Sequence, residues 1–156
     1  MHSERERLRR DLARSHKSAK GRLVCRLYRL GRMLPGPLRG LYQPFYFFMT
    51  DMLVGVTLPL VSEVGGGLLI RHGQGIVISK RSRIGEDCEI YQGVTLGEKH
   101  GVAPQIGDRV FIGANAVLLG GIRVGSGARI GAGAIVLDDV PANGIAIGMA
   151  AQIRGA

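Results

Sequence analysis

The feature that most constrains this chain is a run of six-residue repeats between residues 106 and 141. Each repeat opens with Ile, Leu or Val, and its fifth position is always Val, Ala or Ile. A period of six fits neither an amphipathic helix, which repeats about every 3.6 residues, nor the two-residue alternation of a half-buried strand. A short fixed period of this kind indicates a solenoid, in which stacked turns bury their aliphatic side chains against one another.

The aliphatic pattern extends back to residue 58, with a two-residue slip between 76 and 78 and an excursion at 97–105. If three repeats make one triangular coil, the aliphatic residues form three columns, with neighbours about 4.8 Å apart as in paired strands. Glycine after the aliphatic residue is expected to supply the backbone freedom of tight corners. The columns are Val64–Ile84–Ile106–Val124, Ile70–Ile90–Ile112–Ile130 and Leu58–Ile78–Leu96–Leu118–Val136.

The charge is distributed unevenly along the chain. Residues 1–40 hold twelve Lys/Arg against three Asp/Glu, whereas residues 41–156 hold nine of each, so the whole net charge of +9 lies in the N-terminal part. Such asymmetry is typical of a segment that meets an anionic surface. Without a recognisable nucleic-acid-binding motif, we do not expect nucleic acid as the partner.

Residues 1–57 are expected to form a short α-helical arm, and residues 58–156 the solenoid. Residues 3–20 are predicted to be a frayed, exposed helix or disordered, because they have few apolar residues in helical register. The aromatic-rich run at 38–49 is too short to span a membrane. Two interpretations remain open: the arm caps the open end of the solenoid, or it lies in a membrane interface.

The two cysteines, Cys25 and Cys88, lack metal-ligand spacing and indicate free thiols in a reducing compartment. The N-terminus is rich in Arg and Glu and lacks the apolar core of a signal peptide. We therefore expect a cytoplasmic protein, or one bound peripherally at the inner face of the membrane.

Two histidines lie in the solenoid. His72 occurs in IRHGQGIVIS, next to the slip in the repeat. Counting one coil along the column places Gln92 over His72, followed by the small residues Ala114 and Ala132, which predicts a groove for an extended ligand. His100 lies in the excursion GEKHGVAPQ, and loops that leave a regular scaffold commonly carry function.

Several stretches resemble the hexapeptide-repeat acyltransferases. They are LLIRHGQGIVI, IYQGVTLG, IGDRVFIGANAVLLGGIRVGSGARIGAGAIVLDDVP and IGMAAQIRG, which together cover most of residues 58–156. The sequence is most similar to serine acetyltransferase and to the shorter enzymes of that type associated with polysaccharide biosynthesis. The resemblance implies a left-handed parallel β-helix, a homotrimer with active sites between subunits, and acetyl-CoA as co-substrate.

The resemblance also assigns roles to residues. His72 matches the family's catalytic histidine, a base that removes the proton of an acceptor hydroxyl as it attacks the thioester. His100 is expected to be a second catalytic residue. A backbone N–H or an amide side chain would stabilise the oxyanion, and Gln92 is the nearest side-chain candidate. The residues expected to contact acetyl-CoA are Gly97, Gly113, Ala114, Arg129, Gly131 and Ala132.

The sequence departs from the family beside the catalytic histidine. The family's orienting aspartate is replaced by Thr57, its second aspartate by Arg71, and its Asp-Arg-His loop by one that offers Lys99 and His100. A guanidinium stays charged at any working pH and suits an α-ammonium group poorly. We therefore predict an O-acetyltransferase for the hydroxyl of an anionic sugar precursor of a surface polysaccharide, bound by Arg71, Gln92 and Lys99. The alternative is L-serine.

Two other classes of protein share parts of this pattern. A metal-dependent hydrolase of the γ-carbonic-anhydrase kind needs three imidazoles around Zn²⁺, and the solenoid contains only two histidines, so we expect no metal. A non-catalytic trimeric scaffold remains an alternative because the orienting aspartate is absent.

Overall fold

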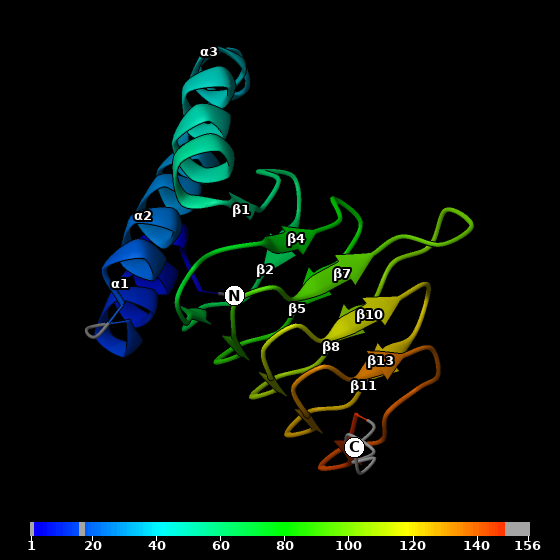
Figure 1. Ribbon diagram of the computed structural model, residues 1–156. Coiled ribbons are helices and arrows are strands. Elements are labelled where there is room, and N and C mark those ends of the chain that lie inside the picture. Colours follow the sequence, from blue (N-terminus) through cyan, green and yellow to red (C-terminus); the bar gives the residue numbers. More distant parts are fainter. Residues whose placement is uncertain (1, 16–17, 149–156) are drawn as a thin grey trace, which may run out of the picture.

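The computed structural model describes residues 2–15 and 18–148, in which a helical N-terminal part is followed by a β-solenoid (Figure 1). The helical part consists of α1 (Glu4–Arg14), α2 (Ala19–Met33), α3 (Gly36–Phe47) and a π-helical segment, η1 (Phe48–Val54), which continues α3. A left-handed Gly55, with φ of 79°, ends η1 and leads into the first strand.

Parallel strands build the three faces of the solenoid. The first face contains β1 (Val56–Thr57), β4 (Ile76–Ile78), β7 (Thr95–Gly97), β10 (Val117–Leu119) and β13 (Ile135–Val136). The second face contains β2 (Glu63–Val64), β5 (Arg83–Ile84), β8 (Gln105–Ile106) and β11 (Arg123–Val124). The third face contains β3 (Leu69–Ile70), β6 (Glu89–Ile90), β9 (Phe111–Ile112), β12 (Arg129–Ile130) and β14 (Ile145–Ala146).

The strand register reproduces the predicted aliphatic columns. Ile70 lies opposite Ile90, which is followed by Ile112 and Ile130. The other two faces are in the same kind of register, and every residue of the three columns is at most 6% exposed. The predicted all-β solenoid is therefore confirmed, with a core that is almost entirely aliphatic.

The glycine that follows each aliphatic residue has a different reason from the expected one. A Cβ built on Gly85 would lie 2.5 Å from the carbonyl carbon of Gly107 in the next coil, and one on Gly107 would lie 2.7 Å from the Ser126 nitrogen. These glycines are absent from the residues with positive φ, so close stacking of coils excludes a side chain there. Left-handed backbone is needed elsewhere in the corners, for example at Gly93 with φ of 71°.

The first helix is docked, contrary to the expectation of a frayed or disordered segment. The Ser3 hydroxyl accepts a hydrogen bond from the Glu6 N–H and caps α1. Arg10 then forms ion pairs with Glu86 and Asp87 of the solenoid, at 2.9 and 2.7 Å. Because these contacts are ionic, the apolar patterning of the sequence does not reveal them.

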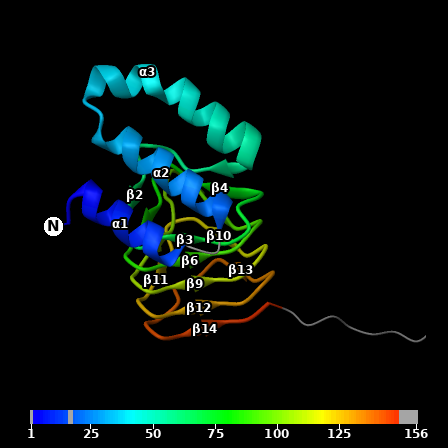
Figure 2. The same cartoon turned by 90° about the vertical axis from the view of Figure 1, so that its left-hand side faces the viewer.

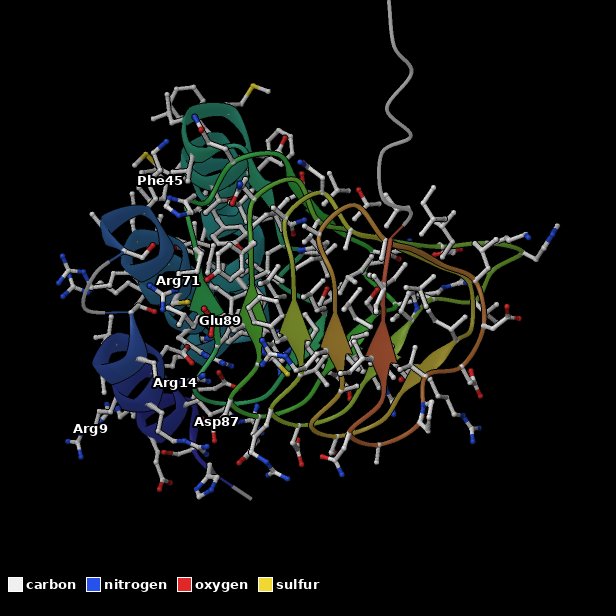
Figure 3. The ribbon with its side chains drawn as sticks, turned by 60° about the horizontal axis from the view of Figure 1, so that its bottom comes forward. Arg9, Arg14, Phe45, Arg71, Asp87 and Glu89 are labelled. Carbon is white, nitrogen blue, oxygen red and sulfur yellow. The ribbon has the colours of Figure 1, made fainter. Side chains whose placement is uncertain are left out.

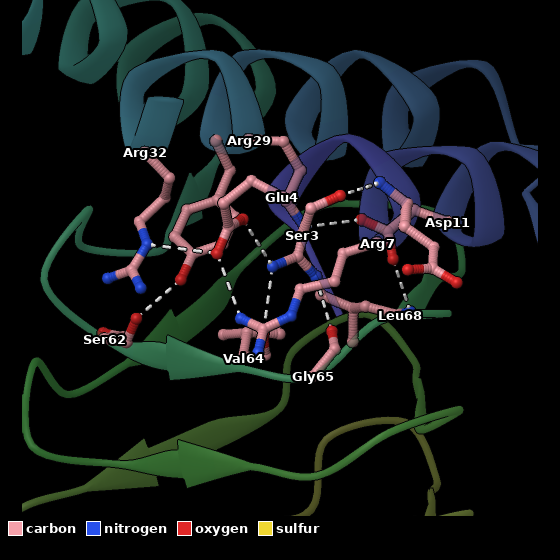
Figure 4. Close-up of polar contacts among 12 residues, drawn as sticks. Ser3, Glu4, Arg7, Asp11, Arg29, Arg32, Ser62, Val64, Gly65 and Leu68 are labelled. Carbon is pink, nitrogen blue, oxygen red and sulfur yellow. Dashed lines mark hydrogen bonds and ion pairs between the residues drawn. The ribbon is translucent and has the colours of Figure 1, made fainter. Parts of the chain in front are cut away.

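A buried arginine joins the helices to the first coil (Figure 4). The Arg29 side chain is fully buried, and its Nε donates to Asp11 Oδ2 at 2.9 Å. Its terminal nitrogens donate to the carbonyl oxygens of Val64 and Gly65 at 2.9 and 2.5 Å. The other oxygen of Asp11 accepts from the Leu68 N–H at 2.9 Å. One ion pair thus satisfies three backbone groups of the first coil.

The helices close the N-terminal end of the solenoid, with α2 lying between α3 and the coils (Figure 2). The Tyr28 and Tyr46 hydroxyls donate to the carbonyls of Ser62 and Leu58, both at 2.6 Å. The Ser18 hydroxyl donates to the carbonyl of Ile70 at 2.7 Å. Among the helices that the structure describes, none is long and apolar enough to cross a membrane.

Candidate active site

The corner that carries His72 is longer than the corners stacked on it. Seven residues separate the inward Ile70 and Ile78, whereas five separate their counterparts Ile90 and Leu96 in the next coil. Backbone hydrogen bonds show where the two extra residues lie. Arg71 N–H donates to the carbonyl of Ile90 at 2.8 Å, and the carbonyl of Gln74 accepts from Gly93 N–H at 2.8 Å. The extra residues are therefore His72 and Gly73.

This position changes the expected stacking over His72. The carbonyl of Gln74 accepts a hydrogen bond from Gly93 N–H in the next coil, and the carbonyl of Gln92 accepts one from Asn115 N–H in the coil after that. Gln74 and Gln92 therefore occupy equivalent positions, so Gln92 stacks on Gln74 and not on His72. The prediction placed the slip after residue 76, whereas the insertion precedes residue 74. His72 is exposed and has φ of 61°, which shows that it stands out of the regular wall.

A pocket of about 370 Å³ surrounds His72. It is formed where the start of α2 meets the long corner, and its lining residues are Ser18, Ala19, Lys20, Arg71, His72 and Gln74. The structure shows no hydrogen bond from Gln92 to His72, and Gln92 Oε1 is buried without a partner among the described residues. Gln74, which the sequence analysis did not select, is the amide side chain that lines the pocket.

An aromatic row connects His72 with Arg129 along the third face. The ring centroids of His72 and Tyr91 are 6.3 Å apart, and those of Tyr91 and Phe111 are 5.3 Å apart. The Arg129 guanidinium lies 4.6 Å from the Phe111 centroid. Sequence reasoning missed Tyr91 and Phe111, although the predicted register places Phe111 beside Arg129.

Arg71 is paired with a carboxylate. Its Nε donates to Glu89 Oε1 at 2.9 Å, and the two side chains lie together beside the strands of the third face (Figure 3). Glu89 lies opposite Leu69, so Arg71 is its diagonal neighbour across β3 and β6. The pair is 35% and 22% exposed. The positive charge that the sequence analysis placed beside His72 is therefore compensated.

Thr57 also has a carboxylate partner. Its hydroxyl donates to Asp51 Oδ1, from the π-helical segment that precedes β1. Thr57 was expected only as the replacement of an acidic residue, and its contact with Asp51 was not predicted from the sequence. Single-turn π-helical segments are frequent near functional sites.

The corner above the His72 pocket is lined by small residues. A Cβ added to Gly113 would lie 2.7 Å from the Ala132 nitrogen, and one on Gly131 would lie 3.2 Å from the Ala146 carbonyl oxygen. The carbonyl of Ala114 accepts a hydrogen bond from Gly133 N–H, which is the same contact to the next coil that the carbonyl of Gln92 makes with Asn115 N–H. Ala114 therefore occupies the position equivalent to Gln92 in the next coil. The four predicted cofactor-binding residues of this corner are therefore brought together.

His100, Lys99 and Gly97 lie at a different corner, between the first and second faces. Lys99 and His100 are exposed and line a pocket of about 520 Å³ together with Asp138 and Asp139. One chain therefore does not bring His100 and His72 into a common pocket. Within residues 2–15 and 18–148, no group of three or more His, Cys, Asp or Glu side chains could hold a metal ion.

Comparison with known proteins agrees with the predicted hexapeptide repeat and with the resemblance to serine acetyltransferases. Residues 103–138 match the family "Bacterial transferase hexapeptide (six repeats)". The serine acetyltransferase of Helicobacter pylori strain J99 is 40% identical over 121 residues, which cover 69% of this chain and 69% of that protein.

Solved structures agree. Serine acetyltransferase isoform 3 of Entamoeba histolytica, in complex with cysteine, superposes with a TM-score of 0.83 at 27% identity, over 98% of this chain and 61% of that one. A serine acetyltransferase in complex with CoA also gives 0.83, at 30% identity, over 97% of this chain and 70% of that one. The predicted left-handed β-helix and the resemblance to serine acetyltransferases are confirmed. This chain belongs to the serine acetyltransferase family of hexapeptide-repeat proteins and is an acyltransferase that uses acetyl-CoA.

Proposed function

We propose that this enzyme is an L-serine O-acetyltransferase. The observation that carries the proposal is the ion pair between Arg71 and Glu89. The anionic-sugar hypothesis was based on Arg71, Lys99 and the basic N-terminal part. The carboxylate of Glu89 compensates Arg71 and so removes the argument against serine. The ion pair neutralises Arg71 as a source of repulsion for an α-ammonium group, which leaves Lys20 as the cation of the pocket lining. The relatives are named serine acetyltransferases.

In the proposed reaction, the imidazole of His72 takes the proton of the serine hydroxyl as its oxygen attacks the thioester carbonyl. The tetrahedral intermediate collapses with cleavage of the C–S bond, and the histidine returns its proton to the CoA thiolate. The row of Tyr91, Phe111 and Arg129 and the small residues of the corner lie on the same side of the solenoid as His72. We assign the CoA arm to this side.

The acceptor can be tested by release of the CoA thiol. L-serine should support turnover, and nucleotide-activated acidic sugars should not. The protein's own thiols interfere little, because Cys25 and Cys88 are at most 1% exposed and burial raises the pKa of Cys88 to about 11. Turnover with an anionic sugar and none with serine would contradict the proposal.

Glu89 offers a second test of the acceptor. Replacing Glu89 with Gln should raise the KM for serine about fivefold or more, because like charges about 4 Å apart repel by about 1 kcal/mol even in water. The double variant Glu89→Gln/Arg71→Gln, which removes both charges, should recover most of the affinity. Equal KM values in the wild type and Glu89→Gln would show that Arg71 does not face the acceptor.

We further propose a homotrimer in which His100 and Lys99 of one subunit complete the His72 pocket of the next. The two groups lie at different corners of one chain, so only a second copy joins them. The first face also exposes apolar side chains, with Val77, Ile135 and Leu137 at 45, 70 and 54% exposure.

Light scattering at micromolar concentration should therefore give three times the 16.7 kDa of a single chain. A monomeric protein with full activity would exclude a role for His100 in the site.

We place the enzyme in the cytoplasm, because its two buried cysteines are unpaired.

A further inference from the structure

The outer side of α3 and η1 carries a stripe of exposed apolar side chains, which we call the α3 stripe. Leu38, Leu41, Phe45, Phe48 and Met52 are 53, 79, 52, 54 and 63% exposed. Their spacing of three or four residues places them on one side of the helix. A contiguous apolar surface of this kind on a water-soluble domain marks an interaction site.

The opposite side of the same helix already has its partners. Tyr46, Thr50 and Val54 are buried, and the Tyr46 hydroxyl bonds to the first coil. The exposed stripe is therefore not the face that holds the helix on the solenoid. Its apolar character is unexplained by folding of the described chain.

One edge of α2 extends the apolar surface. Leu23, Leu30 and Met33 are 36, 47 and 37% exposed, and their spacing puts them on one side of α2 together with Arg26. This edge lies next to the α3 stripe, because Tyr42 joins the two helices. The Tyr42 hydroxyl donates to the carbonyl of Leu27 at 3.1 Å, and its ring centroid is 5.7 Å from that of Phe45.

The charge around this surface is positive. Residues 18–54 contain six Lys/Arg and one acidic residue, Asp51, whose carboxylate is bonded to Thr57. Arg29 and Arg32 are paired with acidic residues of α1. Arg22 and Arg26 make no ion pair within the part of the chain that the structure describes, and Arg26 is exposed.

The surface is also accessible to a flat partner. Helix α3 is the outermost layer at the end of the molecule opposite β14 (Figure 2), and Figure 3 places Phe45 at this helical end. The coils lie on the far side of α2 and cannot block the approach.

We propose that the α3 stripe and the adjoining edge of α2 dock this enzyme on the surface of an anionic lipid bilayer. The apolar side chains would enter the boundary between headgroups and acyl chains, while Arg22 and Arg26 contact the lipid phosphates. The protein lies on the bilayer and does not span it, in agreement with the absence of a spanning helix among those described. A second copy fits this surface less well, because it would bring the unpaired arginines of two chains together without carboxylates between them.

The test is flotation of the full chain with phosphatidylcholine vesicles that contain about one third phosphatidylglycerol, compared with vesicles of phosphatidylcholine alone. Binding to the anionic vesicles is expected, and it should weaken as salt is raised. Arg22→Gln/Arg26→Gln should lower the affinity about fivefold per arginine. Leu41→Ser/Phe48→Ser should lower it by about tenfold or more through loss of buried apolar area.

Matched controls come from the solenoid. Val61→Ser removes an apolar side chain that is 62% exposed, and Lys80→Gln/Arg123→Gln removes two exposed cations; neither should change vesicle binding. Turnover in solution should be unchanged in the helix variants. The proposal is overturned if the wild type does not float with anionic vesicles, or if the helix variants bind as the controls do. It is also overturned if Leu41→Ser/Phe48→Ser lowers the solution mass without changing flotation, which would identify the surface as a contact between copies.

Discussion

Replacing His72 with Asn is expected to lower turnover by about 10²–10⁴-fold, the usual contribution of a general base. Asparagine is preferred to alanine because His72 has φ of 61°, a left-handed conformation that Asn adopts with little strain. The loss of activity can then be attributed to the imidazole and not to a disturbed corner. Circular dichroism and light scattering should match the wild type.

The same substitution at His100 is the companion test, since His100 is also exposed and has φ of 52°. If His100 acts across a subunit interface, His100→Asn should lower turnover of the assembled protein and mixed assemblies with His72→Asn subunits should regain part of it. If His72→Asn keeps near wild-type turnover, the assignment of the general base is wrong.

The second large effect concerns stability. Asp11→Ala should lower the free energy of unfolding by about 3–5 kcal/mol, because it removes the buried carboxylate of the pair and leaves Arg29 only the less buried Glu4, at 3.2 Å. It also removes the acceptor of the Leu68 N–H. Urea unfolding at a fixed protein concentration measures this effect, and helix α1 should detach from the first coil before the solenoid unfolds.

Asp138→Ala is a suitable control, because Asp138 is exposed on the solenoid far along the chain from the helices. The double variant Asp11→Leu/Arg29→Met should not recover this loss, because it leaves the Leu68 N–H and the carbonyls of Val64 and Gly65 without partners. A loss below about 1 kcal/mol in Asp11→Ala would mean that Glu4 alone compensates Arg29.

The solenoid was predictable because each column repeats one requirement many times. An error at a single position does not hide a period that recurs at Ile70, Ile90, Ile112 and Ile130. The site was harder to predict, because it lies where the period fails. The aliphatic pattern confines the two extra residues to the stretch between Ile70 and Ile78, but the backbone hydrogen bonds are needed to assign them to His72 and Gly73.

The charged contacts show a different limit. The partner of Arg71 could have been found, because the predicted columns already place Glu89 on the neighbouring strand and a diagonal pair follows from the register. The docking of α1 through Arg10 could not have been predicted from the sequence, since it depends on where a separate helix meets the solenoid. Hydrophobic periodicity describes faces that bury apolar area and has no signal for a helix held by ion pairs.

The long corner at His72 shows that the length of a corner can change without a change in the rest of the solenoid. The register is regained by residue 76, so the added length does not propagate to the next coil. Corner insertions are therefore nearly independent of one another, and a lineage can lengthen or shorten one without re-optimising the core. The length of this corner can then reshape the acceptor pocket, while the side to which we assign the CoA arm keeps its register.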